Sequence, residues 1–356
     1  MPVPEVVPFG VLAAPDRDGR RDVDLVVLES SAVRVAIVTY GAALWSVEAP
    51  DRDGRRQPIA LQLPTLDELA DRNRNPYLGA TCGRVAGRIA GARFVLDDAA
   101  VVLDPNEGRH QLHGGPDGFD RRCWAVAETG PTEDGGRVVL GLTSPDGDQG
   151  YPATLEVTAT YELHGHVLRI AYDATADGTT VVNLTNHAYW NLAGPESWVV
   201  DGAIGDHELR LPGDRYLPVD DQAIPVEPLT AVAGTAFDLR QARLLADATA
   251  DLGHGIDHAY EVPPGDEVER AAFDGLRLAA ELHHPASGRT LTVATDQPAV
   301  VVYTGNWLGP PFAFQAAVCL ETQAFPDAPN RPELGSVVLA HGERYRSTTE
   351  LTFGVR

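Results

Sequence analysis

A carboxylate follows three apolar residues near the carboxyl end of the chain, in Val318-Cys319-Leu320-Glu321. Such a run is typical of a buried strand, and an isolated ionised carboxylate is costly to bury. Glu321 must therefore have a partner or take up a proton. Two interpretations stay open at this point: Glu321 is a functional acid or base, or it is one half of a structural ion pair.

A second polar group lies between Val182 and Leu192, where three asparagines, two aromatic residues and His187 occur together. This composition suits a carbohydrate site, because hydroxyl groups need donors and acceptors and the apolar face of a sugar packs on an aromatic ring. The alternative is a buried hydrogen-bond network that only fixes the core.

Four further polar residues have small, turn-forming neighbours. His113 lies in a glycine-rich turn, Asp257 precedes a strand, and Arg84 and Arg88 are four positions apart in a glycine-rich segment. Taken singly, the histidine is typical of a surface loop and the aspartate of a turn or cap, while the arginines bind hydroxyls or carboxylates or cap carbonyl groups. Together with the two groups above, they supply the acids and bases that proton transfer near neutral pH requires.

Period-two alternation dominates the chain and predicts strands. The clearest segments are residues 33–39, 93–96, 138–140, 155–161, 168–172, 290–294 and 300–303. The sequence His164-Gly-His166 between two of them predicts a tight hairpin.

Helix signals are few, and they are limited to residues 65–72, which open with a capping box, and residues 239–246. They do not alternate with the strands as a parallel sheet requires. The chain is therefore predicted to be all-β, a large antiparallel sandwich or barrel with few short helices, and a single domain over residues 1–356.

The composition excludes several classes of partner. There are 28 basic and 51 acidic side chains, and the resulting net charge of −23 repels nucleic acid and anionic membrane surfaces. No apolar window is long enough to span a bilayer and the amino terminus has no basic or apolar signal region, so we expect a cytoplasmic protein. Cys82, Cys123 and Cys319 are odd in number and far apart, which favours reduced thiols.

Eight motifs occur in the order found in a known family. They are Tyr40-Gly-Ala-Ala43 with Pro50-Asp-Arg-Asp-Gly54, Asn75-Pro-Tyr-Leu-Gly-Ala80 with Gly83-Arg84 and Arg88-Ile89, Leu112-His-Gly-Gly115, Ser144-Pro-Asp-Gly147 with Gly150-Tyr-Pro152, Asn183-Leu-Thr-Asn-His187, Asp257-His258, Tyr303-Thr-Gly-Asn306, and Leu320-Glu-Thr-Gln323 with Pro326-Asp327. In these motifs the chain resembles the aldose 1-epimerases, or galactose mutarotases, from about residue 9 to its end.

The resemblance implies a large antiparallel β-sandwich that needs no cofactor or metal and interconverts the α and β anomers of a free hexose such as galactose or glucose. By position, Glu321 matches the general base of the family and His187 its general acid. The residues that match its sugar-holding groups are Arg88, His113 and Asp257, while Tyr303 and Asn306 lie in a motif near the site without a firm role. The implied partner is a small aldose sugar, and the expected state is a monomer or homodimer.

Two positions depart from the pattern of the family. Many members have asparagine where this chain has Gly87, and some have glutamine where it has Val301. Two amides that face the sugar are thus expected to be missing, so the preference for particular hydroxyls could differ. Trp190 and Trp307 are expected to provide apolar contact in compensation.

Three other functions remain open from the sequence. The first is a sugar-binding or sensing protein on the same scaffold. The second is an iron or zinc site built from His113, His187, Asp257 and Glu321. The third is glycoside hydrolysis by Asp257 and Glu321 as paired carboxylates.

Overall fold

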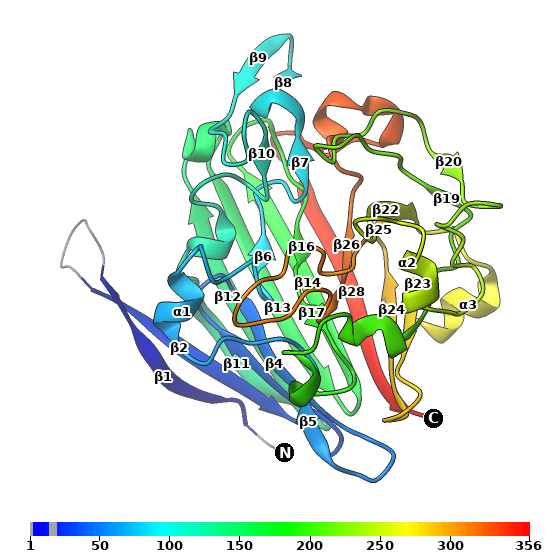
Figure 1. The fold of residues 1–356 in the computed structure, drawn as a ribbon. Helices are drawn as coiled ribbons and strands as arrows, with labels where there is room; N and C mark the ends of the chain where they lie inside the picture. Colours follow the sequence, from blue (N-terminus) through cyan, green and yellow to red (C-terminus); the bar gives the residue numbers. More distant parts are fainter. Residues whose placement is uncertain (1–2, 14–19) are drawn as a thin grey trace.

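Three antiparallel sheets make up most of the computed structural model, which describes residues 3–13 and 20–356 (Figure 1). The first two residues of the amino-terminal segment considered above lie outside the described residues. The five-stranded sheet follows chain order: β1 (Glu5–Ala13), β2 (Arg20–Glu29), β3 (Arg34–Val38), β4 (Ala43–Pro50) and β5 (Arg56–Pro58).

The nine-stranded sheet is the largest. Its strands are, in spatial order, β11 (Ala125–Thr132), β12 (Gly135–Ser144), β13 (Leu155–His164), β14 (Val167–Ala176), β28 (Arg344–Val355), β24 (Arg289–Thr295), β23 (Arg277–His283), β18 (Glu208–Arg210) and β21 (Arg243–Leu244). The carboxyl-terminal strand β28 thus lies at its centre, between β14 and β24.

The six-stranded sheet carries two of the five candidate site residues, Asp257 and Glu321. Its spatial order is β17 (Tyr189–Trp190), β26 (Val318–Gln323), β25 (Ala299–Tyr303), β22 (Asp257–Glu261), β19 (Arg215–Tyr216) and β20 (Thr230–Ala231). Short pairs complete the fold: β6 (Thr81–Cys82) with β16 (Thr185–Asn186), β7 (Arg88–Ile89) with β10 (Gln111–Leu112), β8 (Arg93–Leu96) with β9 (Ala99–Val102), and β15 (Thr180–Val181) with β27 (Val338–Leu339).

The main hydrophobic core lies between these sheets. It takes Tyr161 from β13, Val35 from β3 and Leu320 from β26, and so draws on all three sheets. Strand β13 shows how the sequence directs this packing, because every second residue from Leu155 to Leu163 is buried while the intervening ones are partly or fully exposed. The observed architecture confirms the predicted antiparallel sandwich.

Strands β25 and β26 of the six-stranded sheet are buried on both faces. On β26, Thr322 faces the nine-stranded sheet, where its hydroxyl forms a hydrogen bond with Thr349 of β28. Alternation places Cys319, Glu321 and Gln323 on the opposite face. All six residues of this strand are buried, so its three polar residues lie in the interior together with its three apolar ones.

All seven predicted strand segments are confirmed, as β3, β8, β12, β13, β14, β24 and β25. The predicted hairpin is also confirmed, since His164 pairs with Val167 across a turn of two residues. Helix α1 (Leu66–Ala70) begins where expected, and Thr65 accepts a hydrogen bond from the Glu68 amide as its cap.

The predicted helix over residues 239–246 is wrong. Arg243 and Leu244 instead form the edge strand β21, paired with Leu209 and Glu208 of β18. Helix α2 (Leu245–Thr249) begins only after this strand. Pairing with the edge of a large sheet satisfies backbone groups that a short helix leaves unpaired at its ends, and it overrides the local propensity.

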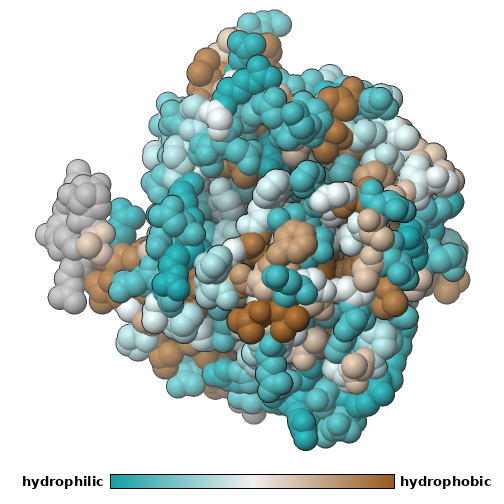
Figure 2. All heavy atoms as spheres, viewed as in Figure 1, coloured by the Kyte–Doolittle hydropathy of each residue, from teal (hydrophilic) through white to brown (hydrophobic). Residues whose placement is uncertain are grey.

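The remaining helix, α3 (Glu267–Ala272), is also short, and across residues 3–13 and 20–356 no helix combines the length and apolar character that a membrane span requires. The face in Figure 2 is predominantly hydrophilic, with apolar residues in separate patches, as expected for a strongly charged surface. Cys82, Cys123 and Cys319 are free thiols, which confirms the prediction from their number and spacing that they are reduced.

Arg84 is a structural residue, which resolves one alternative left open by the sequence. Its guanidinium donates hydrogen bonds to the carbonyl groups of Pro152 and Ala153 at 2.8 and 2.9 Å and to the Ser144 hydroxyl at 2.7 Å. The side chain is 1% exposed. It therefore ties the glycine-rich segment to two distant loops and does not reach a cleft.

We expect Arg84→Met to lower the free energy of unfolding by about 3 kcal/mol or more, because several buried acceptors lose their donor. Denaturation in urea measures this change. The matched control is Arg93→Met on the exposed end of β8, which should change stability by less than about 0.5 kcal/mol. Equal stability of the two variants would contradict the structural role of Arg84.

Candidate active site

A cavity of about 250 Å³ lies on the face of the six-stranded sheet that points away from the core. The five residues predicted from the sequence all line it: Arg88, His113, His187, Asp257 and Glu321. They come from five separate parts of the chain, so the fold brings together residues that are far apart in the sequence.

The register of three neighbouring strands determines which residues form the floor of the cavity. Across β22, β25 and β26, Asp257 pairs with Tyr303 and Tyr303 pairs with Cys319. In the next row, Val301 lies directly between Ala259 and Glu321. The carboxylate therefore has an apolar neighbour on this side, and its polar partners come from beyond the sheet.

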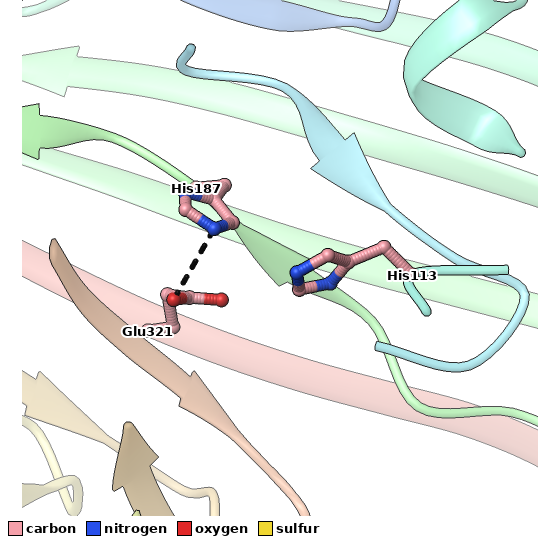
Figure 3. A group of neighbouring side chains, drawn as sticks. All are labelled: His113, His187 and Glu321. Atoms are coloured by element: carbon pink, nitrogen blue, oxygen red, sulfur yellow. Dashed lines mark ion pairs between the residues drawn. The ribbon is translucent and has the colours of Figure 1, made fainter. Parts of the chain in front are cut away.

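His187 is the nearest polar partner of Glu321. Its Nε2 atom lies 3.5 Å from Glu321 Oε1, and the two side chains are 6% and 4% exposed (Figure 3). The separation is long for a hydrogen bond, so the two groups are not bound to each other and each can form a hydrogen bond with a bound molecule. The pair has the two groups that coupled proton transfer needs.

The ring of His187 is held by its surroundings. Its backbone amide donates to the Ala80 carbonyl, and its carbonyl accepts from the Gly79 amide. The rings of Tyr77 and Tyr189 stack on the imidazole with centroids 5.9 and 5.0 Å away. These contacts fix the plane of the ring over the cavity.

His113 reaches the cavity from the turn after β10. The turn is tight, because a Cβ atom on Gly114 would lie 1.7 Å from the carbonyl oxygen of Gly83, and the glycine has a φ of +88°. The Gly87 amide donates a hydrogen bond to His113 Nδ1 at 3.2 Å. The neutral ring therefore carries its proton on Nε2 and is a hydrogen-bond donor there.

Arg88 is oriented by two carboxylates. Its Nε and Nη2 atoms donate to Glu107 at 2.6 and 2.9 Å, and its Nη1 atom lies 3.8 Å from Asp257 Oδ2. The fork bound to Glu107 fixes the plane of the guanidinium. The remaining nitrogen atom and Asp257 together offer donor and acceptor groups at the cavity wall.

Burial changes the proton affinities of the central pair in opposite directions. It raises the pKa of Glu321 well above its ordinary value, the charge of Asp257 adds to the rise and Arg88 opposes it. Burial also lowers the pKa of His187 to about 4. Above about pH 4 and up to the raised pKa of Glu321, the pair therefore holds one proton.

The other two titrating groups follow the same physics. Burial lowers the pKa of His113 well below its ordinary value, and the neighbouring His187 and Arg88 add to this. Burial raises the pKa of Asp257, while Arg88 opposes the rise. The cavity thus disfavours any net charge that has no partner.

The family model for aldose 1-epimerase matches residues 24–352. The chain belongs to the aldose 1-epimerase family. As a member, it is an isomerase. The galactose mutarotase of Bos taurus is 39% identical over 346 residues, which cover 95% of this chain and 96% of that protein. The aldose 1-epimerase of Escherichia coli K12 is 39% identical over 292 residues, which cover 78% of this chain and 80% of that protein.

Solved structures of the family share the fold. The galactose 1-epimerase of Lactobacillus acidophilus NCFM superimposes with a TM-score of 0.82 at 29% identity, covering 99% of this chain and 98% of that chain. The aldose epimerase homologue of C. elegans has a TM-score of 0.83 at 26% identity, covering 92% of this chain and 98% of that chain. The β-sandwich implied by the resemblance is thereby confirmed.

Both departures from the family pattern face the cavity. Gly87 has a φ of +76°, and a Cβ atom there would lie 3.3 Å from the side-chain nitrogen of Gln323. Val301 lies beside Glu321 in the register above. At these two positions the chain presents a backbone and an isopropyl group to the cavity.

Trp190 and Trp307, which were both expected to contact the sugar, lie in different places in the structure. Trp307 lines the cavity and is 73% exposed, so it offers a ring at the rim. The expectation for Trp190 is wrong, because this residue is 2% exposed and packs in the main core. It follows Tyr189 on β17, and alternation turns it to the opposite face of the sheet.

Most of the amides in the segment from Val182 to Leu192 are structural. Asn183, Asn186 and Asn191 each donate to backbone carbonyl groups. Only His187 and Tyr189 of this segment line the cavity. The three asparagines therefore fit the hydrogen-bond network, and His187 and Tyr189 leave the carbohydrate site a prediction.

Tyr303 lines the cavity, and its hydroxyl accepts a hydrogen bond from the Trp307 amide. Asn306 is nearby in the chain and donates a hydrogen bond to the Ile256 carbonyl.

Sequence reasoning missed the role of Glu107 in orienting Arg88. It also gave no role to Tyr77, although the residue lies in one of the family motifs. Pairing over 19 positions between a loop and a short strand leaves no periodic signal by which Glu107 could have been found.

A metal site would use His113, His187 and Glu321, whose ligand atoms lie within 4.8 Å of one another. Asp257 is not part of this group. The hydrogen bond from Gly87 argues against the metal interpretation, since it leaves the proton of His113 on the nitrogen that faces the cavity. A ligating histidine needs a free lone pair there and donates its other N–H outward.

Glu321→Gln is expected to stabilise the fold near neutral pH. Between the ordinary pKa of the unfolded chain and the raised pKa of the folded one, the folded state binds more protons, so the free energy of unfolding falls as pH rises. Glutamine does not titrate, so the variant avoids this fall. Its free energy of unfolding should be higher than that of the wild type by about 1 to 2 kcal/mol at pH 7 and by less near pH 4. Urea denaturation at both pH values measures it.

The control for this variant is Glu133→Gln in an exposed turn, which should leave stability unchanged at both pH values. A Glu321→Gln protein that is less stable than the wild type at pH 7 would show that the carboxylate is held by favourable ion pairing instead.

Proposed function

We propose that this enzyme interconverts the α and β anomers of a free hexose such as galactose or glucose, with Glu321 as general base and His187 as general acid. The observation that carries the proposal is the buried pair of these residues, 3.5 Å apart, at a cavity that Arg88, His113 and Asp257 also line. The membership of the family supports the reaction class.

The pair suits the two proton transfers of ring opening. Glu321 takes the proton of the C1 hydroxyl while His187 Nε2 gives a proton to the ring oxygen, so the bond between C1 and that oxygen breaks and an aldehyde forms. Rotation about the bond from C1 to C2 and reclosure on the other face give the second anomer. The same two residues serve in reverse, which a reversible isomerisation requires.

In the sugar-free protein the raised pKa of Glu321 and the lowered pKa of His187 place the shared proton on the carboxyl group, so this assignment requires that the proton move to His187 before ring opening. The carboxylate with imidazolium and the carboxyl with neutral imidazole differ only in the position of one proton within the pair. Burial holds the total at one proton over a wide pH range. Each transfer of this kind typically contributes about 10² to 10⁴ to the rate.

The remaining residues suit sugar binding. His113 presents an N–H group, and Arg88 with Asp257 offers a donor beside an acceptor, so neighbouring hydroxyls on one ring could be held together. The Trp307 ring at the rim gives an apolar surface for the carbon face of the sugar. A cytoplasmic location and a monomeric or dimeric state stay predictions.

The test is polarimetry on freshly dissolved α-galactose and α-glucose. Glu321→Gln and His187→Asn are each expected to lower kcat by about 10² or more, because one proton transfer is lost. Asp257→Asn should mainly raise KM. The same assay over a panel of aldoses shows which hydroxyls the pocket with Gly87 and Val301 requires.

Full activity in both catalytic variants would refute the assignment. Saturable sugar binding by the wild type without faster equilibration would support the sugar-binding or sensing protein. Release of free sugar from an aryl glycoside would support hydrolysis by Asp257 and Glu321.

The pH profile of kcat/KM is a separate test. We expect a bell shape whose acid limb has an apparent pKa of about 4, below which the pair carries two protons. Its alkaline limb follows the raised pKa of Glu321, above which the pair carries none. Rates corrected for buffer catalysis at constant ionic strength measure both limbs, and a profile without an alkaline limb would contradict the one-proton pair.

A further inference from the structure

The imidazole of His187 has a partner on each edge. Its Nε2 atom faces Glu321 at 3.5 Å, and its Nδ1 atom lies 3.6 Å from the sulfur atom of Cys319. The stacked tyrosines fix the plane of the ring, but a rotation of 180° about the Cβ–Cγ bond keeps that plane and exchanges the edges. That rotation would put carbon atoms where Nε2 and Nδ1 now lie, so the contact at Nδ1 favours the orientation in which Nε2 faces Glu321.

One strand supplies both partners. Cys319 and Glu321 are two positions apart on β26, so their side chains point to the same face of the sheet. Cys319 pairs with Tyr189 across β17 and is fully buried. The thiol and the carboxyl group thus reach opposite edges of one ring from a rigid scaffold.

We propose that Cys319 is a positioning residue that holds the proton of neutral His187 on Nδ1, so that Nε2 is the atom that exchanges protons with the sugar. This rests on the proposed function. In ring opening, the Nε2–H bond breaks, its electron pair stays on nitrogen and the proton goes to the ring oxygen, which keeps the electron pair of its broken bond to C1.

The ring is then neutral, with a single proton on Nδ1 that needs an acceptor, and the sulfur atom is that acceptor. The proton of the C1 hydroxyl is on Glu321 at this stage, so charge and protons balance. Reclosure returns a proton from the sugar to the free lone pair on Nε2. A neutral ring with its proton on Nε2 could not accept it there.

Sulfur also suits the strength of the acid. A carboxylate beside Nδ1 would stabilise the imidazolium and weaken proton donation, whereas a thiol is only a weak acceptor. Burial raises the pKa of Cys319 well above its ordinary value, so the group stays a neutral thiol. The other titratable groups around His187 are Glu321, His113, Tyr77 and Tyr189.

His113 shows the opposite arrangement. The Gly87 amide donates to its Nδ1 atom, which places the proton of the neutral ring on Nε2. The two imidazoles that line the cavity thus have different partners at the same ring atom. The ring of His113 can donate a hydrogen bond to a hydroxyl group, whereas the ring of His187 can exchange a proton at Nε2.

The test compares Cys319→Ala with Cys82→Ala. Cys82 is the matched control, since it is also a fully buried thiol near the cavity, and among the described residues it makes no hydrogen bond to His187. Cys319→Ala should lower kcat about tenfold or more with KM changed less than about twofold, because the sugar contacts remain. Cys319→Ser keeps an acceptor and should restore most of the rate.

The second readout is the ¹⁵N NMR spectrum of the His187 ring in the sugar-free protein. In the wild type and in Cys82→Ala the proton should lie on Nδ1, and in Cys319→Ala it should be distributed over both nitrogens. Cys319→Val fills the space without an acceptor and should behave like the alanine variant if that variant is unstable.

Equal kcat in the alanine variants at positions 319 and 82, or a proton that stays on Nδ1 without the thiol, would overturn the proposal. The NMR readout does not depend on turnover. A wild type that fails to equilibrate anomers would therefore refute the proposed function, while the spectra would still decide the role of Cys319.

Discussion

The alternation of side chains along strand β26 is the constraint on which the site depends. Leu320 and Thr322 face the core between the sheets, and this anchors the strand by packing and by the hydrogen bond to Thr349. The same register necessarily turns Cys319 and Glu321 to the cavity. A slip of one residue would exchange the two faces, so the packing of the core fixes the position of the carboxyl group.

Burial then gives the site its chemistry. Strand β26 is buried along its whole length, and Glu321 and His187 lie in a poorly hydrated space that shifts their pKa values in opposite directions. The one-proton pair is thus a product of the fold rather than of either residue alone. The cost is stability, which the nine-stranded sheet and its extensive core offset.

Arg84 and Arg88 show how structural and functional roles divide within one segment. Arg84 is bound by carbonyl groups of two loops, and this holds the backbone from which Gly87 and Arg88 reach the cavity. The amide of Gly87 in turn donates to His113 Nδ1 and so places the proton of this ring on Nε2. The polar wall of the cavity therefore depends on a buried guanidinium that does not line it.

The sequence predicted the strands from alternation and singled out Glu321 as a carboxylate in an apolar run, whereas the roles of the site residues came from the resemblance to the family. It did not separate Arg84 from Arg88, since the two arginines have similar neighbours and differ only in what distant loops offer them. It placed Trp190 in the site because composition does not show which face of a strand a residue takes. The edge strand β21 and the contact of Glu107 depend on long-range pairing, which no local pattern records.

The central claim is that the buried pair acts on C1 and the ring oxygen of a sugar. A crystal structure of Glu321→Gln with galactose bound tests it most directly. The account predicts the glutamine side chain at about 2.6 to 3.2 Å from the C1 hydroxyl and His187 Nε2 at a similar distance from the ring oxygen. A sugar whose C1 points toward Trp307 at the rim, away from both residues, would contradict it.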